Sequence, residues 1–177
     1  MKKILALVCT VLLGVTAASA QVTQGEVAAG LNLNYGSEIE NIGLGAKFQY
    51  TIIDHLRAEV GFNYFFKKNY ESMWDANLNA HYLINVYQDK LYIYPIVGLN
   101  FSSMSFDEKG FIKKLKEIGG VVDPDFELKD INRFGLNLGA GAEYRVTEKI
   151  GLSLEYRHTI LKDIDQGVFS IGANYKF

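Results

Sequence analysis

The side chains best suited to catalysis are one histidine, two serines and one aspartate near the ends of strand-like runs. A serine nucleophile requires a histidine within reach and an acid that orients this histidine. His158, Ser102, Ser103 and Asp163 could lie at a comparable height if these runs stand side by side. However, His158 is followed by threonine and isoleucine, whereas a deacylase-like pattern would place a serine nearby. The sequence therefore gives little support to acyl chemistry.

Metal and phosphate chemistry has no better candidates. His81 is accompanied by no second histidine or cysteine at a ligand spacing, so we expect a hydrogen-bonded buried side chain rather than a zinc ligand. The acidic stretch DPDFE, residues 123–127, lacks the further spaced acids of a calcium loop and is expected to form a turn. The glycines follow a strand period and form no phosphate-binding loop. We predict no catalytic site, no cofactor and no metal, and hence no enzyme.

Charge and the first twenty residues indicate an exported protein. The 18 basic and 20 acidic residues of the 177-residue chain give a net charge of −2, which predicts no nucleic-acid partner. The segment MKKILALVCTVLLGVTAASA combines two lysines, an apolar stretch shorter than a membrane-spanning helix and a small-residue cleavage site. We predict that residues 1–20 are a signal peptide cleaved near Ala20. Residues 21–177 then form one domain without cysteine, because Cys9 lies in the signal.

Beyond this segment, apolar and polar residues alternate with a period of two, which indicates strands with two unlike faces. Eight such runs lie near residues 26–35, 42–52, 56–66, 74–86, 91–101, 133–145, 150–157 and 169–177. Short connections follow the second, fourth and sixth runs, and longer ones follow the others, the longest being residues 102–132. Short turns at one end and long loops at the other predict an all-β, eight-stranded antiparallel up-and-down barrel.

One column of alternating side chains carries no charge, and its aromatic residues gather at both strand ends. Tyr35, Tyr64 and Trp74 fall at the long-loop end, and Tyr50 and Tyr144 at the short-turn end, with aliphatic residues between them. A lipid-facing surface places aromatic rings at both headgroup levels, whereas a protein core does not sort them by height. We therefore predict a transmembrane barrel in the outer membrane of a Gram-negative cell. A soluble exported binding barrel is an alternative, because it shows the same alternation.

The other column is polar and, with lipid outside, must fill the lumen. Eight strands leave an interior just wide enough for side chains. The predicted lumen charge network consists of Glu26, Lys47, Arg57, Glu59, Asp75, Arg133, Glu143, Arg145, Glu155, Arg157 and Lys176. Because unpaired charges would be costly there, we expect interlocking ion pairs that plug the barrel.

Two features depart from the regular pattern. Pro95 removes a backbone donor within the fifth run, so we expect a bulge or a local break of the ladder there. Leu83, Tyr92, Tyr94 and Ile96 put apolar bulk on the inward side, where they could form a packed patch.

The last eleven residues, GVFSIGANYKF, alternate up to a terminal aromatic residue. With YPIVGLNF at residues 94–101 and FGLNLGAGAEYRV at residues 134–146, they resemble the small outer-membrane β-barrel family, which includes opacity-type proteins, outer membrane protein X and the barrel of OmpA, chains often labelled as porins. The resemblance implies that the C-terminal strand is an assembly signal read by the barrel assembly machinery, carried by Phe169, Ile171, Ala173, Tyr175 and Phe177.

The long connection is the remaining place for a specific function. In FIKKLKEIGG, an amphipathic helix of about two turns is expected, with external-loop residues Phe111, Lys113, Lys114, Leu115 and Lys116. Its lysines could meet lipopolysaccharide phosphates, or the helix could cover the barrel mouth. We predict a structural or surface-interaction protein with a plugged lumen, whose partners are outer-membrane lipid and lipopolysaccharide; the extracellular ligand of its loops is unknown. The alternative is a narrow channel for ions or small solutes.

Overall fold

The computed structural model describes residues 24–68, 71–107, 112, 117, 130–161 and 165–177. The predicted signal peptide and the predicted helix residues Phe111 and 113–116 lie outside the described residues. The strands are β1 Val27–Gly36, β2 Asn41–Ile53, β3 Leu56–Lys68, β4 Glu71–Tyr82, β5 Ile84–Tyr87, β6 Leu91–Phe106, β7 Ile131–Arg145, β8 Ile150–Leu161 and β9 Gln166–Lys176. No helix among the described residues has the length and apolar character needed to cross a membrane.

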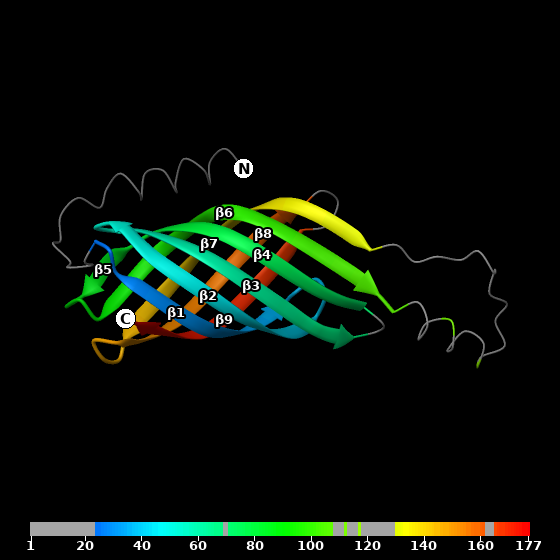
Figure 1. Ribbon diagram of the computed structural model, residues 1–177, viewed down its shortest axis with the longest axis horizontal. Coiled ribbons are helices and arrows are strands. Elements are labelled where there is room, and N and C mark those ends of the chain that lie inside the picture. Colours follow the sequence, from blue (N-terminus) through cyan, green and yellow to red (C-terminus); the bar gives the residue numbers. More distant parts are fainter. Residues whose placement is uncertain (1–23, 69–70, 108–111, 113–116, 118–129, 162–164) are drawn as a thin grey trace.

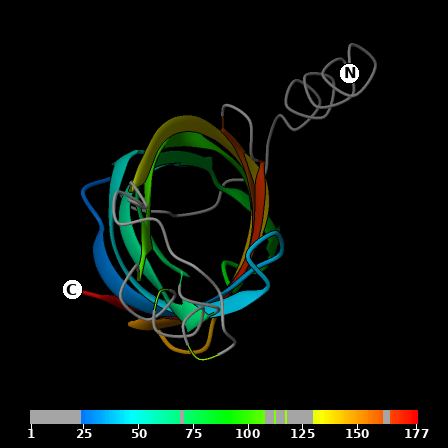
Figure 2. The same cartoon turned by 90° about the vertical axis from the view of Figure 1, so that its right-hand side faces the viewer.

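The strands form one closed barrel. Strands that follow one another in the chain pair antiparallel, except β4 and β5, and β1 also pairs with β9, which closes the sheet. β4 and β5 both pair with β6 and are two pieces of one strand interrupted at Leu83. The end-on view in Figure 2 shows the resulting ring of strands, and Figure 1 shows their common tilt. The predicted eight-stranded antiparallel up-and-down barrel is therefore confirmed.

The pairing register gives the barrel a fixed stagger. A path that follows directly paired residues around the wall ends ten residues further along the chain than it began. Its residues are Val27, Tyr50, Ala58, Ala80, Val97, Leu138, His158, Gly167 and Ser37, the last pair being joined by the Ser37 N–H bond to the Gly167 carbonyl. Stagger and strand number together determine the tilt of the strands and the width of the lumen.

The expected ladder break is found opposite Pro95. His81 pairs with Ile96, and Ile84 pairs with Ile93, but no pairing joins the residues between them. On the β3 side of the break, the Leu83 N–H donates to the carbonyl of His55 in the short β2–β3 turn at 2.6 Å, which continues the β3–β4 pairing by one residue. The His55 ring nitrogen Nδ1 also lies 3.2 Å from the Leu83 carbonyl oxygen. The prediction of a local break is thus confirmed. The pairing register with β6 is the same on both sides of the gap.

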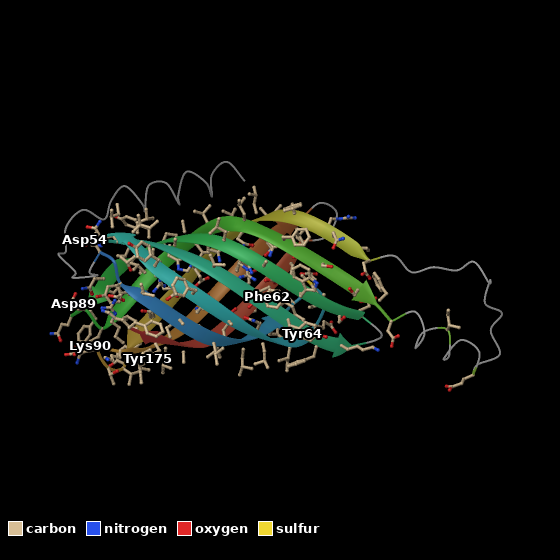
Figure 3. The ribbon with its side chains drawn as sticks, viewed as in Figure 1. Asp54, Phe62, Tyr64, Asp89, Lys90 and Tyr175 are labelled. Carbon is tan, nitrogen blue, oxygen red and sulfur yellow. The ribbon has the colours of Figure 1, made fainter. Side chains whose placement is uncertain are left out.

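The short turns lie together at one end of the barrel. Figure 3 shows Asp54 of the β2–β3 turn, and Asp89 and Lys90 of the β5–β6 turn, at the same end as Tyr175. His55 has a φ of 76°, and Gln88 and Asp89 have φ values of 40° and 57°, the left-handed conformations that tight hairpins require. We call this the short-turn end, and the opposite one the long-loop end.

Candidate functional site: the barrel lumen

The wall of the barrel has an apolar outside and a polar inside. Along β1, the outward residues Leu31 and Leu33 are 71% and 58% exposed, whereas the inward residues Asn32 and Asn34 are buried. Every long strand has exposed apolar residues, with buried amides and charges between them. This distribution is the reverse of that in a water-soluble protein. This arrangement suits a wall with lipid outside.

Aromatic residues of the outer face contact one another near the long-loop end. Trp74 of β4 stacks on Phe62 of β3 at a ring-centroid distance of 5.6 Å and lies 5.5 Å from Phe101 of β6. Phe101 is 4.8 Å from Phe134 of β7. At the short-turn end, Tyr175 and Phe177 make an edge-to-face contact at 5.4 Å. The rings therefore occupy both ends of the apolar belt, as the sequence predicts.

The lumen is filled in four successive layers, of which the first lies at the short-turn end. Here Glu26 forms two ion pairs, in which Lys176 Nζ lies 2.5 Å from Oε2 and Arg145 Nη2 lies 3.2 Å from Oε1. The Arg145 guanidinium also lies over the Tyr92 ring, 4.6 Å from its centroid. We call these three charged residues the rim layer.

The next layer contains two buried ion-pair systems and is called the charge layer. Arg57 Nη1 donates to Glu143 Oε2 at 2.8 Å. Lys47 Nζ donates to Glu155 Oε1 at 2.7 Å and lies 3.7 Å from Glu59 Oε2. All three carboxylates and both bases are nearly inaccessible to solvent, so each charge depends on these partners for its stabilisation.

Aromatic and amide side chains complete the charge layer. The Tyr94 hydroxyl donates to Glu155 Oε1 at 2.8 Å, and its ring stacks on His81 at 4.8 Å and contacts the Arg57 guanidinium. His81 is fully buried beside Arg57 and Glu59, the position of a packed polar side chain. Among the described residues, no group of three or more potential metal ligands occurs, at His81 or elsewhere.

The middle of the lumen is an amide layer that surrounds one carboxylate. Asp75, 1% exposed, accepts from Asn63 at 2.6 Å and from Asn77, and Arg157 Nη2 lies 3.4 Å from its other oxygen. Further bonds extend this layer around the barrel, through Asn32, Asn34, Asn79, Asn100, Asn137, Ser102, Thr159 and Ser170. Amides that donate and accept at once can link strands across the lumen without adding net charge.

An apolar layer closes the long-loop end. Phe65, Met73 and Val168 are buried in contact with one another, and Ile39 and Met104 pack against them. This layer was not predicted from the sequence. The signal was present, because Phe65 occupies an inward position beside the outward Phe66, and Met73 and Val168 are also on the inward column.

The inward apolar residues near the ladder break form the expected patch. Leu83, Tyr92, Tyr94 and Ile96 are buried in one cluster. Tyr94 lies against Gly141 of β7, where an added Cβ would come within 2.4 Å of the Tyr94 ring. Glycine at this inward position therefore leaves the space that lets the ring reach Glu155.

Replacing Gly141 by alanine is expected to lower the free energy of unfolding by about 1–3 kcal/mol, the cost of overpacking a filled interior. Urea unfolding of the refolded protein, followed by tryptophan fluorescence, measures this change. Gly61→Ala is the matched control, because an added Cβ at Gly61 would meet nothing closer than 3.9 Å. Equal stability of the two variants would show that the Tyr94 ring does not depend on this space.

The predicted network residues lie on the inner wall, and all but Arg133 form ion pairs with other described residues. Arg133 lies at the long-loop end, where Nη1 donates to the Asn132 carbonyl and no ion pair with a described residue is formed. The described residues that were considered for acyl chemistry are not brought together. Ser102 donates to Asn100 inside the lumen, whereas His158 points to the outer face and lies beside Asp165. Asp163 lies outside the described residues.

Comparison with known proteins agrees with this geometry. The family model for the outer membrane protein beta-barrel domain matches residues 5–177. The chain belongs to this family. Outer membrane protein X of Escherichia coli K12 is 24% identical over 148 residues, covering 84% of this chain and 74% of the relative.

Solved structures share the fold at low sequence identity. The N-terminal barrel domain of Pseudomonas aeruginosa OprF aligns with a TM-score of 0.67 and 14% identity, over 87% of this chain and 98% of that one. Neisserial surface protein A aligns with a TM-score of 0.61 and 20% identity, over 86% and 96%. The chain is thus an integral β-barrel of the cell outer membrane, and barrels of the outer membrane protein X type are not enzymes.

Proposed function

We propose that this chain is a closed barrel that acts as a structural and surface-interaction protein and does not conduct solutes. The observation that carries the proposal is the sequence of four layers across the lumen, each made by side chains from several strands. The described spaces inside the wall are small, about 20 Å³ beside the rim layer and about 30 Å³ beside Arg133 at the long-loop end. These volumes admit a water molecule or two, but no sugar.

Energetics also favour a closed lumen. A passing solute would have to separate buried ion pairs and buried hydrogen bonds between amide side chains. The groups that form them have almost no access to bulk water. Each buried donor or acceptor left without a partner costs about 1–3 kcal/mol, and a charge costs more. The charge layer, the amide layer and the apolar layer would all have to open together.

Sugar flux into liposomes tests the proposal. The mature chain, residues 21–177, is refolded into vesicles, and folding is verified by the different gel mobility of boiled and unboiled samples. We expect vesicles that contain the folded protein to shrink in a hypertonic sugar solution and to stay shrunken, as protein-free vesicles do. A large porin in the same vesicles is the positive control. Recovery of volume with this protein would favour the narrow-channel alternative.

The surface-interaction part of the proposal concerns the long-loop end. The strands β6 and β7 lead into residues 107–130, which include the lysines 113, 114 and 116. A structural relative, Ail of Yersinia pestis, has been solved in complex with the heparin analogue sucrose octasulfate. We infer from the lysines that these loops bind anionic groups, such as lipopolysaccharide phosphates.

Assembly through the last strand is also part of the proposal. β9 closes the barrel by pairing with both β1 and β8, and Phe177 follows it at the short-turn end, 73% exposed. Deleting Phe177 removes an outward ring and the bond from its N–H to the Val27 carbonyl, and leaves the pairings of residues 166–176 in place. We expect a lower amount of folded barrel in the outer membrane of cells, measured by unboiled gel mobility. Refolding in detergent should be little changed, and equal losses in both assays would indicate a purely structural role.

A further inference from the structure

The outer wall of the barrel contains a hollow near the long-loop end. It lies across β4, β6 and β7, opens to the outside of the barrel and has a volume of about 500 Å³. Its outward lining residues are Ala76, Leu78, Leu99, Phe101, Phe134 and Leu136. We call it the wall groove.

The groove arises because one small residue interrupts a row of large ones. Phe62, Ala76, Phe101 and Phe134 are paired directly across four adjacent strands. In the next row towards the short-turn end, Leu78, Leu99 and Leu136 are paired in the same way. Alanine therefore leaves a gap between phenylalanine rings above a shelf of leucines.

Aromatic rings line the long-loop side of this gap. The Trp74 ring lies two residues from Ala76 and contacts the rings of both Phe62 and Phe101. Phe134, at the β7 side of the groove, is the most exposed large apolar residue among those described, at 79%. The labelled Phe62 in Figure 3 lies in this part of the wall, near Tyr64. The groove is thus an apolar surface with a rigid aromatic edge.

The groove lies at a level in the membrane that the acyl chains of one leaflet reach. Long loops of outer-membrane barrels face the outside of the cell, and aromatic rings mark the headgroup level. A groove just below the aromatic row at the long-loop end therefore faces the start of the outer-leaflet acyl chains. Lipopolysaccharide supplies the acyl chains of that leaflet in the outer membrane of a Gram-negative cell.

We propose that the wall groove binds one acyl chain of lipopolysaccharide. The chain lies over Ala76, between the phenylalanines of the aromatic edge and the leucines of the shelf. Continuity with the lipid-facing belt provides free access from the membrane, and the apolar lining requires no polar group of the ligand. This inference is independent of whether the lumen conducts, because the groove lies on the other side of the wall.

The chain carries its own probe of this groove, because Trp74 is the one tryptophan in the sequence. The mature protein is refolded into vesicles of phosphatidylcholine with brominated acyl chains, which quench tryptophan fluorescence on contact. Lipopolysaccharide with unbrominated chains is then added in increasing amounts. We expect Trp74 fluorescence to recover at a mole fraction several-fold below that at which unbrominated phosphatidylcholine has the same effect.

Two variants on β4 separate specific binding from a general effect of the lipid. Ala76→Leu fills the gap and should abolish the preference for lipopolysaccharide. Ala80→Leu adds the same side chain on the same outward face, four residues towards the short-turn end, and should keep it.

Three outcomes would overturn the proposal. The first is equal recovery with lipopolysaccharide and phosphatidylcholine. The second is an unchanged preference in Ala76→Leu, although unboiled gel mobility shows that the variant is folded. The third is weak quenching before any addition, together with a cross-linked dimer that Ala76→Leu prevents, since a second copy would then occupy the groove.

Discussion

Replacing Arg57 by alanine is expected to lower the free energy of unfolding by about 3–5 kcal/mol, the cost of leaving one member of a buried ion pair without its partner. Arg57 is 5% exposed and donates to Glu143 at 2.8 Å, and its guanidinium also lies 4.9 Å from the centroid of the Tyr94 ring. The loss leaves Asn174 Nδ2, which donates to Glu143 Oε2 at 3.0 Å, as the remaining hydrogen-bond donor to this carboxylate among the described side chains. Urea unfolding in detergent or lipid measures the effect.

Two further variants identify the cause of this destabilisation. Arg145→Ala removes an arginine from the rim layer, where Glu26 retains Lys176 as a partner, and should cost about 1 kcal/mol or less. Arg57→Met combined with Glu143→Leu removes both charges of the buried pair and should recover most of the loss. If Arg57→Ala costs no more than Arg145→Ala, the charge layer does not hold the lumen together as described.

Replacing Leu138 by arginine is expected to cost about 2–4 kcal/mol, the penalty for a cation on the lipid face at the membrane midplane. Leu138 is the central residue of β7, points outward and is 48% exposed. The variant should fold less completely into vesicles, as measured by unboiled gel mobility at increasing urea concentration.

Val146→Arg is the control at matched exposure. Val146 is 52% exposed but lies just beyond β7 at the short-turn end, where the same substitution should cost about 0–1 kcal/mol. Equal and small losses for the two variants would mean that water surrounds the whole wall. That outcome would contradict the membrane placement.

The fold could be predicted from the sequence because its physical causes are local and periodic. Lipid outside and polar side chains inside impose a period of two on every strand, and eight runs of this kind are directly visible in the chain. The break at Leu83 followed from Pro95, since proline has no N–H to give to the ladder. Each of these signals can be read within one or two neighbouring strands.

The interior was less predictable because its contacts join distant strands. Lys47 and Glu155 come from β2 and β8, and their pairing depends on register and stagger around the barrel. Arg133 lies on the predicted inner column, yet its height places it beside apolar residues at the long-loop end. Phe65 points inward because the strand period continues through this residue, between the outward Tyr64 and Phe66, whereas the sequence pattern placed no aromatic residue of this end in the lumen.

Ion conductance across a planar lipid bilayer is the most direct test of the closed lumen, because ions are smaller than any sugar. The refolded chain of residues 21–177 is added to one side, and single-channel current is recorded at increasing voltage. The account predicts no discrete current steps from protein that is folded by gel mobility. Regular steps from the folded protein would mean that the charge, amide and apolar layers open to ions, and would contradict the account.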